Sequence, residues 1–123
     1  MKKYLIVKVL IISFVFFLSP TIQAASDWED SIESYKQATR INPDDADAHF
    51  NLGGVYGKSG MYKEAIEAYK QAIRIDTDFA QAHYNLGIVY VHFYERDSAL
   101  EQYKTLKSLN AELANKLFDS IYE

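Results

Sequence analysis

The stretches AHFNLGGVY (Ala48–Tyr56) and AHYNLGIVY (Ala82–Tyr90) nearly coincide, and they lie 34 residues apart. A second pair recurs at the same distance, with AIEAY at Ala65–Tyr69 and ALEQY at Ala99–Tyr103. A fixed period of this length is typical of repeat proteins, in which stacked units present an extended surface for binding. The sequence therefore predicts a mode of action, binding, before it indicates what is bound.

Two full units follow from this period, at residues 46–79 and 80–113. A partial unit precedes them at residues 25–45, because SIESYKQATRINPDD (Ser31–Asp45) matches AIEAYKQAIRIDTDF (Ala65–Phe79). The partial unit contains only the second half of the repeat. One helix at the start of the stack therefore lacks its usual neighbour.

Each unit is predicted to be a helix, a short turn and a second helix. Apolar residues recur three and four positions apart in both halves of the unit, as on one face of a helix. The break between the halves is Gly57–Gly60, and Pro43 marks the boundary before the first full unit. Gly53 and Gly87 lie in mid-helix at the same repeat position, which indicates a close approach between helices. The predicted fold class is all-α.

The repeated residues resemble those of the tetratricopeptide (TPR) family. That family's pattern is a Leu-Gly pair followed by Tyr, Ala and an aromatic residue. The matching residues in the two copies are Leu52, Gly53, Tyr56, Ala65, Tyr69, Leu86, Gly87, Tyr90, Ala99 and Tyr103. The resemblance implies a short right-handed solenoid of stacked helix pairs. The second copy departs from the pattern at His92-Phe93-Tyr94, where a turn containing glycine is usual.

Both ends of the stack carry recognisable signals. Ser26 and Glu29 have the spacing of a capping box, which predicts that the first helix begins at Ser26. Residues 111–123 predict a last helix that covers the final repeat, with residues 114–123 as the end of this C-terminal capping helix.

Residues 1–24 have the order of a secretory signal peptide: Lys2 and Lys3, an apolar run to Leu18, and the small residue Ala24 at the predicted cleavage point. The run is about 15 residues, shorter than the roughly 20 that a membrane-spanning helix needs. We expect an exported protein, periplasmic or secreted. The alternative is an uncleaved segment that anchors the chain in the inner membrane.

Charge and composition narrow the partners. The chain has no cysteine, so neither a lipid-attachment site nor a disulfide can form. Removal of residues 1–24 takes away three lysines and no acid, which changes the net charge from −4 to −7. An acidic chain is a poor ligand for nucleic acid or for an anionic lipid surface. We expect another protein as the partner.

No chemistry is predicted. His49, His83 and His92 do not have the spacing of a zinc pair, and the acids Asp44, Asp45 and Asp47 lack the glycine and distant glutamate of a calcium loop. Phosphate-binding loops and nucleophile motifs are missing from the sequence as well. We expect neither catalysis, nor a metal site, nor a cofactor.

The resemblance implies that the first helix of each pair lines the concave side of the stack and holds a peptide segment there. The positions that project onto that side are Asp47, Phe50, Gln81, Tyr84, Ile88, Phe118 and Tyr122. Phe50, Tyr84 and Phe118 would form one aromatic row across three layers. Asn51 and Asn85 are not joined by a Lys or Arg, so an apolar or aromatic segment is expected rather than a terminal carboxylate. These aromatics could instead fill gaps between helices as core residues.

Two other functions remain open at this stage. The partial unit is expected to leave an apolar face around Trp28, Ile32 and Tyr35 without a neighbour, and such a face favours self-assembly into a homo-oligomeric scaffold. The chain could also be an accessory subunit of an envelope enzyme complex.

Overall fold

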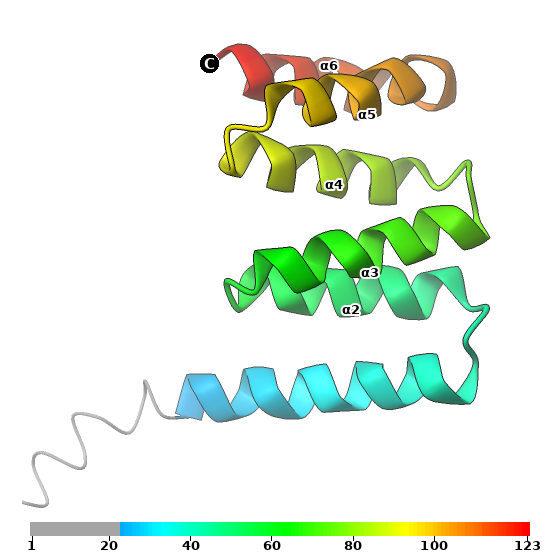
Figure 1. The fold of residues 1–123 in the computed structure, drawn as a ribbon, viewed down its shortest axis with the longest axis vertical. Helices are drawn as coiled ribbons and strands as arrows, with labels where there is room; N and C mark the ends of the chain where they lie inside the picture. Colours follow the sequence, from blue (N-terminus) through cyan, green and yellow to red (C-terminus); the bar gives the residue numbers. More distant parts are fainter. Residues whose placement is uncertain (1–22) are drawn as a thin grey trace, which may run out of the picture.

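A computed structural model describes residues 23–123, which form a stack of helices (Figure 1). An N-terminal helix is already present at residue 23 and ends at residue 41. It is followed by α2 (Ala46–Lys58), α3 (Tyr62–Ile75), α4 (Ala80–His92), α5 (Arg96–Leu109) and α6 (Ala111–Tyr122). The predicted all-α stack of helix–turn–helix units is confirmed. The predicted signal peptide lies outside the described residues except for its last two.

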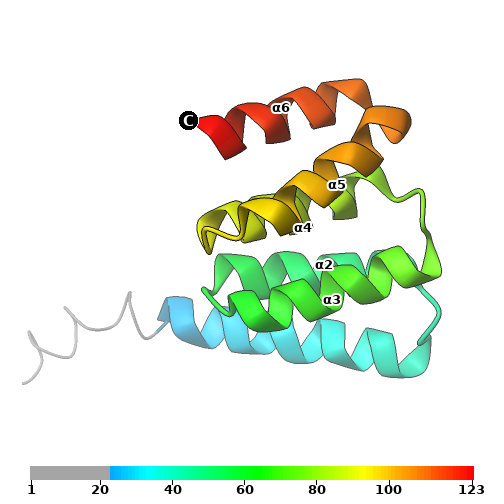
Figure 2. The same cartoon turned by 45° about the horizontal axis from the view of Figure 1, so that its top comes forward.

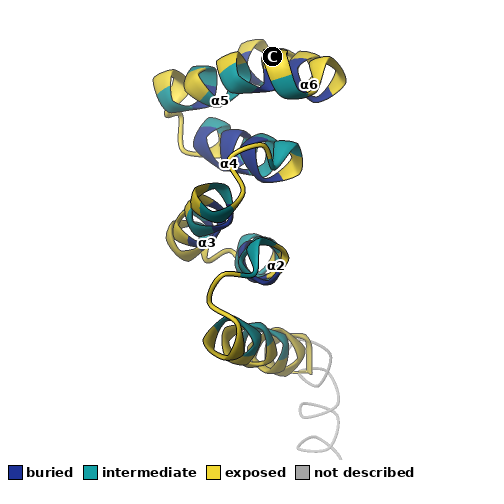
Figure 3. Cartoon of the chain, turned by 90° about the vertical axis from the view of Figure 1, so that its right-hand side faces the viewer, coloured by how far each residue is buried: buried dark blue, intermediate teal, exposed yellow. Residues whose placement is uncertain are grey.

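The helices separate into two sides. α2, α4 and α6 lie on one side of the stack, while α3 and α5 lie on the other (Figure 3). Within residues 23–123, no helix is long and apolar enough to cross a membrane.

The predicted start of the first helix at Ser26 is wrong. Residues 23–25 are already helical, so Ser26 lies inside the helix and does not cap it. Gln, Ala and Ala are good helix formers, and nothing in this stretch stops the helix. The Gln23 side chain also donates a hydrogen bond to the Asp27 carboxylate one turn later (3.1 Å).

The turns within the two full units have the same conformation despite their different sequences. Gly60 has a φ of 81° and Tyr94, its repeat equivalent, has a φ of 59°. The amide after each of these residues donates to a carbonyl five residues earlier: Met61 to Tyr56 (2.8 Å) and Glu95 to Tyr90 (2.9 Å). Both helices therefore end in a Schellman motif, and the second one places a tyrosine in the left-handed region.

The connection between α5 and α6 is shorter than its counterparts. Asn110 ends α5 and also caps α6, where its side chain accepts a hydrogen bond from the Leu113 amide (3.1 Å). The corresponding connection from α3 to α4 spans residues 76–79. The chain therefore reverses over one residue (Figure 2), and α6 packs against α4 as well as α5.

The main hydrophobic core is formed by residues of α3, α4, α5 and α6. Its largest fully buried side chains are Leu106 and Leu117, and the repeat alanines Ala65 and Ala99 are also fully buried. Within the described residues, neither the N-terminal helix nor α2 contributes to the fully buried part of this cluster. The buried apolar side chains of α2, Ala48 and Leu52, lie outside this cluster.

The crowding predicted at Gly53 and Gly87 is confirmed, but the two glycines face different neighbours. A Cβ at Gly53 would lie 2.8 Å from the ring of Tyr69, whereas a Cβ at Gly87 would lie 2.5 Å from a methyl group of Leu117. The α6 helix therefore occupies, at the second layer, the place that Tyr69 takes at the first.

We predict that Gly87→Ala lowers the free energy of unfolding by about 1–3 kcal/mol, because Leu117 is enclosed and cannot yield. In a Leu117→Ala background the same change should be neutral or stabilising, since alanine favours helix over glycine. The control is Gly54→Ala, where the nearest atom is 3.9 Å away and the helix should gain stability. Urea unfolding of Gly87→Ala, Leu117→Ala, the double variant and Gly54→Ala measures the free energy of unfolding of each. Additive effects of Gly87→Ala and Leu117→Ala would contradict the contact between these residues.

Tyr94→Gly should raise the free energy of unfolding by about 0.5–1 kcal/mol. Relief of the left-handed conformation is worth about 1–2 kcal/mol, and the entropy of glycine in the unfolded chain offsets part of it. Tyr94 is 95% exposed, so its removal exposes no core. Gly60→Ala should have the opposite sign, since φ there is 81° and nothing lies within 4 Å. Thermal unfolding compares the two, and a loss of stability in Tyr94→Gly would refute the assignment of strain.

Candidate functional site

We define the inner face by the seven predicted residues, which the structure places on α2 (Asp47, Phe50), α4 (Gln81, Tyr84, Ile88) and α6 (Phe118, Tyr122). Asp47 and Gln81 are exposed, while Phe50, Tyr84 and Ile88 are half-buried. Phe118 is 41% exposed and Tyr122 is 53% exposed. The apolar surface of this face is therefore greatest on α6.

The inner face has two aromatic clusters instead of one row. Phe50 packs on Phe79 (4.8 Å between ring centroids) and on Tyr69 (5.8 Å). Phe118 packs on Tyr103 (5.3 Å) and Tyr122 (4.6 Å). Among the described residues, no ring contact joins Tyr84 to either cluster.

The short connection at Asn110 explains this break. It removes three residues from the repeat period, so α6 begins 31 residues after α4 and Asn115 takes the helix position that corresponds to Tyr84, while Phe118 lies three residues further along α6. The half-buried Tyr84 and Ile88 instead form the part of the face between the two clusters.

The Tyr69 side chain packs against Phe50 of the inner face. It is buried, and its hydroxyl accepts a hydrogen bond from the Asn85 side chain (3.4 Å). Burial raises the pKa of Tyr69, and the bond from Asn85 opposes that rise. Asn85 is thus held by an internal partner, while Asn51 on α2 is exposed.

Two basic residues that sequence reasoning did not place here lie beside the inner face. Lys116 pairs with Glu112 (2.8 Å), and this contact raises the pKa of Lys116 and lowers that of Glu112, with a smaller contribution from Tyr84 to Lys116. Arg96 lies 5.1 Å from the centre of the Tyr122 ring and donates to the Ile121 carbonyl (3.4 Å). Both cations already have partners within the chain.

Part of the stripe of Trp28, Ile32 and Tyr35 is covered. Ile32 and Tyr35 are half-buried, and Thr39, one turn further on, lines a pocket together with residues of α2. The side of the N-terminal helix that carries this stripe is therefore turned toward α2. Only Trp28, at the open end, is classed as exposed (37%).

The repeat histidines differ in their surroundings. His83 is buried, with Nε2 2.9 Å from the Thr77 carbonyl oxygen and Nδ1 2.8 Å from Oε1 of the Gln102 carboxamide. His49 bonds in the same way to the Pro43 carbonyl (2.9 Å), but Ala68 occupies the position of Gln102. No group of three or more His, Cys, Asp or Glu residues between residues 23 and 123 could hold a metal ion.

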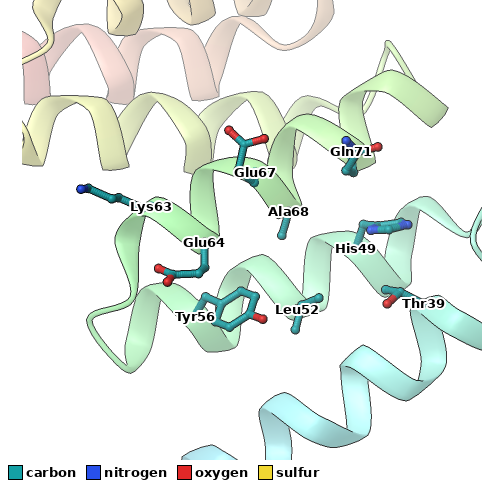
Figure 4. Close-up of a pocket in the computed structure, with 9 residues that line it drawn as sticks. All are labelled: Thr39, His49, Leu52, Tyr56, Lys63, Glu64, Glu67, Ala68 and Gln71. Carbon is teal, nitrogen blue, oxygen red and sulfur yellow. The ribbon is translucent and has the colours of Figure 1, made fainter.

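A pocket of about 410 Å³ opens where Gln102 has no equivalent (Figure 4). The N-terminal helix supplies Thr39, and α2 supplies His49, Leu52 and Tyr56. The α3 helix supplies Ala68, Gln71 and the charged residues Lys63, Glu64 and Glu67. Sequence reasoning missed this pocket. The signal was present in the repeat alignment, since the first layer has Ala68 and Thr39 where the second has Gln102 and Ile73.

Comparison with solved structures shows the same fold in several proteins. The chain is similar to the TPR2B domain of yeast Sti1 in its pHsp70 complex (23% identity; 89% of this chain and 92% of that one; TM-score 0.70). It is also similar to PcrH in complex with the chaperone binding region of PopD (16%; 90% and 88%; 0.71). A third similar structure is MamA (26%; 98% and 82%; 0.66).

The curated proteins contain no match. The family model described as TPR repeat matches residues 24–60 and 58–92, which together make up more than half of the chain. The predicted resemblance is therefore confirmed, and the chain belongs to the TPR repeat family.

Proposed function

We propose that this chain is a protein–protein interaction module that holds an apolar or aromatic segment of a partner protein against its inner face, without catalysis. The observation that supports this most directly is the exposed aromatic surface of Phe118 and Tyr122 on α6. Exposed aromatic side chains are enriched among the residues that dominate binding energy in interfaces. Two of the similar structures are complexes with partner segments, which is consistent with this use of the fold.

The surroundings of the aromatic residues favour this class of ligand. Arg96 lies against the Tyr122 ring, and Lys116 pairs with Glu112, whose carboxylate would repel a terminal carboxylate placed beside Lys116. Tyr84 and Ile88 continue the apolar surface from α6 across α4. An extended segment with apolar side chains on one side fits a surface that runs from Tyr122 on α6 to Tyr84 and Ile88 on α4.

Photo-crosslinking in intact cells tests the location of the partner. A photoreactive residue in place of Ile88 should give a defined crosslinked product, since position 88 is at the middle of the inner face. The same residue in place of Lys104, which is exposed on α5 on the other side of the stack, should not. Equal crosslinking from both positions would place the partner elsewhere.

With the crosslinked partner segment in hand, we predict that Phe118→Ala weakens its binding about tenfold or more, as removal of an aromatic anchor does. Phe93→Ala is the matched control, because Phe93 is also 41% exposed but packs on Tyr62 of α3, away from the inner face. Isothermal titration with both folded variants measures the difference. A Phe118→Ala protein that binds as well as wild type would sink the proposal.

We also propose that the module is exported and that its signal peptide is removed after Ala24. The basis is the charged, apolar, small-residue order of residues 1–24. Mass spectrometry of the protein from the envelope or medium should give a mature chain that begins at Ala25. An intact N-terminus in a membrane fraction would support the anchored alternative.

A further inference from the structure

The pocket beside His49 is lined by residues of the N-terminal helix, α2 and α3 (Figure 4), and none of the seven inner-face residues is among them. Its residues have counterparts 34 positions later, where the same space is filled from within the chain. Gln102 reaches His83 in the second layer, while Ala68 leaves the equivalent space beside His49 open. The contact between Gln102 and His83 therefore indicates which kind of group would fill the space beside His49.

The two histidine rings are anchored in the same way. Nε2 of His83 lies 2.9 Å from the Thr77 carbonyl, and Nε2 of His49 lies 2.9 Å from the Pro43 carbonyl. Since each Nε2–H donates to a carbonyl, Nδ1 is the nitrogen left for another partner. His83 finds that partner in Gln102, whose Oε1 lies 2.8 Å away, whereas no hydrogen bond to Nδ1 of His49 is found within residues 23–123. The carboxamide of Gln71, which also lines the pocket, accepts from Arg74 instead (2.9 Å).

A carboxamide is well suited to this position. Its NH₂ donates to Nδ1 of a neutral imidazole, and its C=O accepts from Nδ1–H of a protonated one. A carboxylate can only accept and an ammonium group can only donate. The carboxamide of Gln102 is the group that this protein itself uses at the equivalent site.

The rest of the pocket narrows the choice further. Leu52 and Ala68 offer an apolar floor for an aliphatic stem. The rim carries the glutamates Glu64 and Glu67 together with Lys63, and Lys70 lies 3.6 Å from Glu67, so opposite charges balance there and favour neither an anionic nor a cationic side chain. A neutral side chain with an aliphatic stem and a carboxamide end meets these conditions.

We propose that the His49 pocket receives a glutamine side chain from a partner protein and thereby completes the pair that His83 and Gln102 form within the chain. This second contact site is independent of the inner face. A partner that spans both sides would be held by an aromatic contact on one and a carboxamide contact on the other.

The direct test is an NMR titration of the full chain with acetyl-glutamine N-methylamide. We expect saturable shifts of the His49 ring resonances with a dissociation constant on the order of millimolar, as suits so small a probe. The corresponding derivatives of methionine, glutamate and lysine are the matched probes, and each should bind at least several-fold more weakly. Absence of a saturable shift with the glutamine probe would overturn the proposal, as would equal binding of the methionine or lysine probe.

Ala68→Gln supplies the decisive variant, because it rebuilds the second-layer pair inside the first layer. It should abolish the shifts caused by the probe while thermal stability stays equal to wild type or rises. Thr39→Ile replaces Thr39, on the opposite wall of the pocket, with the residue type found at the equivalent second-layer position. It should weaken probe binding, and it takes the place of Ala68→Gln if that variant does not fold. Unchanged binding by either variant, when folded, would show that the probe binds elsewhere.

Gln102→Ala combined with Ile73→Thr makes the reciprocal change, since Ile73 is the second-layer equivalent of Thr39. It should open an equivalent space beside His83, so that the glutamine probe now shifts the His83 ring resonances as well. A folded double variant without this second site would argue against the carboxamide–histidine pairing as the basis of recognition.

Discussion

The contact between Gly87 and Leu117 is the constraint on which the upper part of the stack depends. With no Cβ at Gly87, the Leu117 side chain lies directly on α4 and is completely enclosed. This contact holds α6 against α4, α6 also packs against α5, and α6 in turn presents Phe118 and Tyr122 on the inner face. The position of Phe118 and Tyr122 on the inner face therefore depends on the close packing of α6 against α4.

Differences between the repeats, more than their similarities, create the candidate sites. The shared positions build the layers: leucine and tyrosine fill them, and alanine and glycine allow close approach. The pocket exists because Ala68 and Thr39 are smaller than their second-layer equivalents. Each unit of a solenoid contacts mainly its neighbours, so one layer can lose side-chain volume without disturbing the next.

The sequence predicted the inner-face residues by projection, and all seven lie on α2, α4 and α6, but it misjudged how they join. A period of 34 residues does not predict the single-residue connection at Asn110, which shifts Phe118 along α6 relative to Tyr84 on α4. Likewise, Arg96 and Lys116 reach the inner face from positions that the repeat pattern does not mark. Such contacts depend on side-chain direction and on how far one helix is displaced along another.

The sequence by itself determined the period, the all-α class, the family and the crowding at Gly53 and Gly87, because these follow from the order of residue types along the chain. Only the tertiary structure decided which neighbour crowds each glycine, that the Trp28 side of the N-terminal helix turns toward α2, and that a space opens beside His49. The reason is physical: periodicity specifies which face of a helix is apolar, whereas packing specifies what fills the volume against that face.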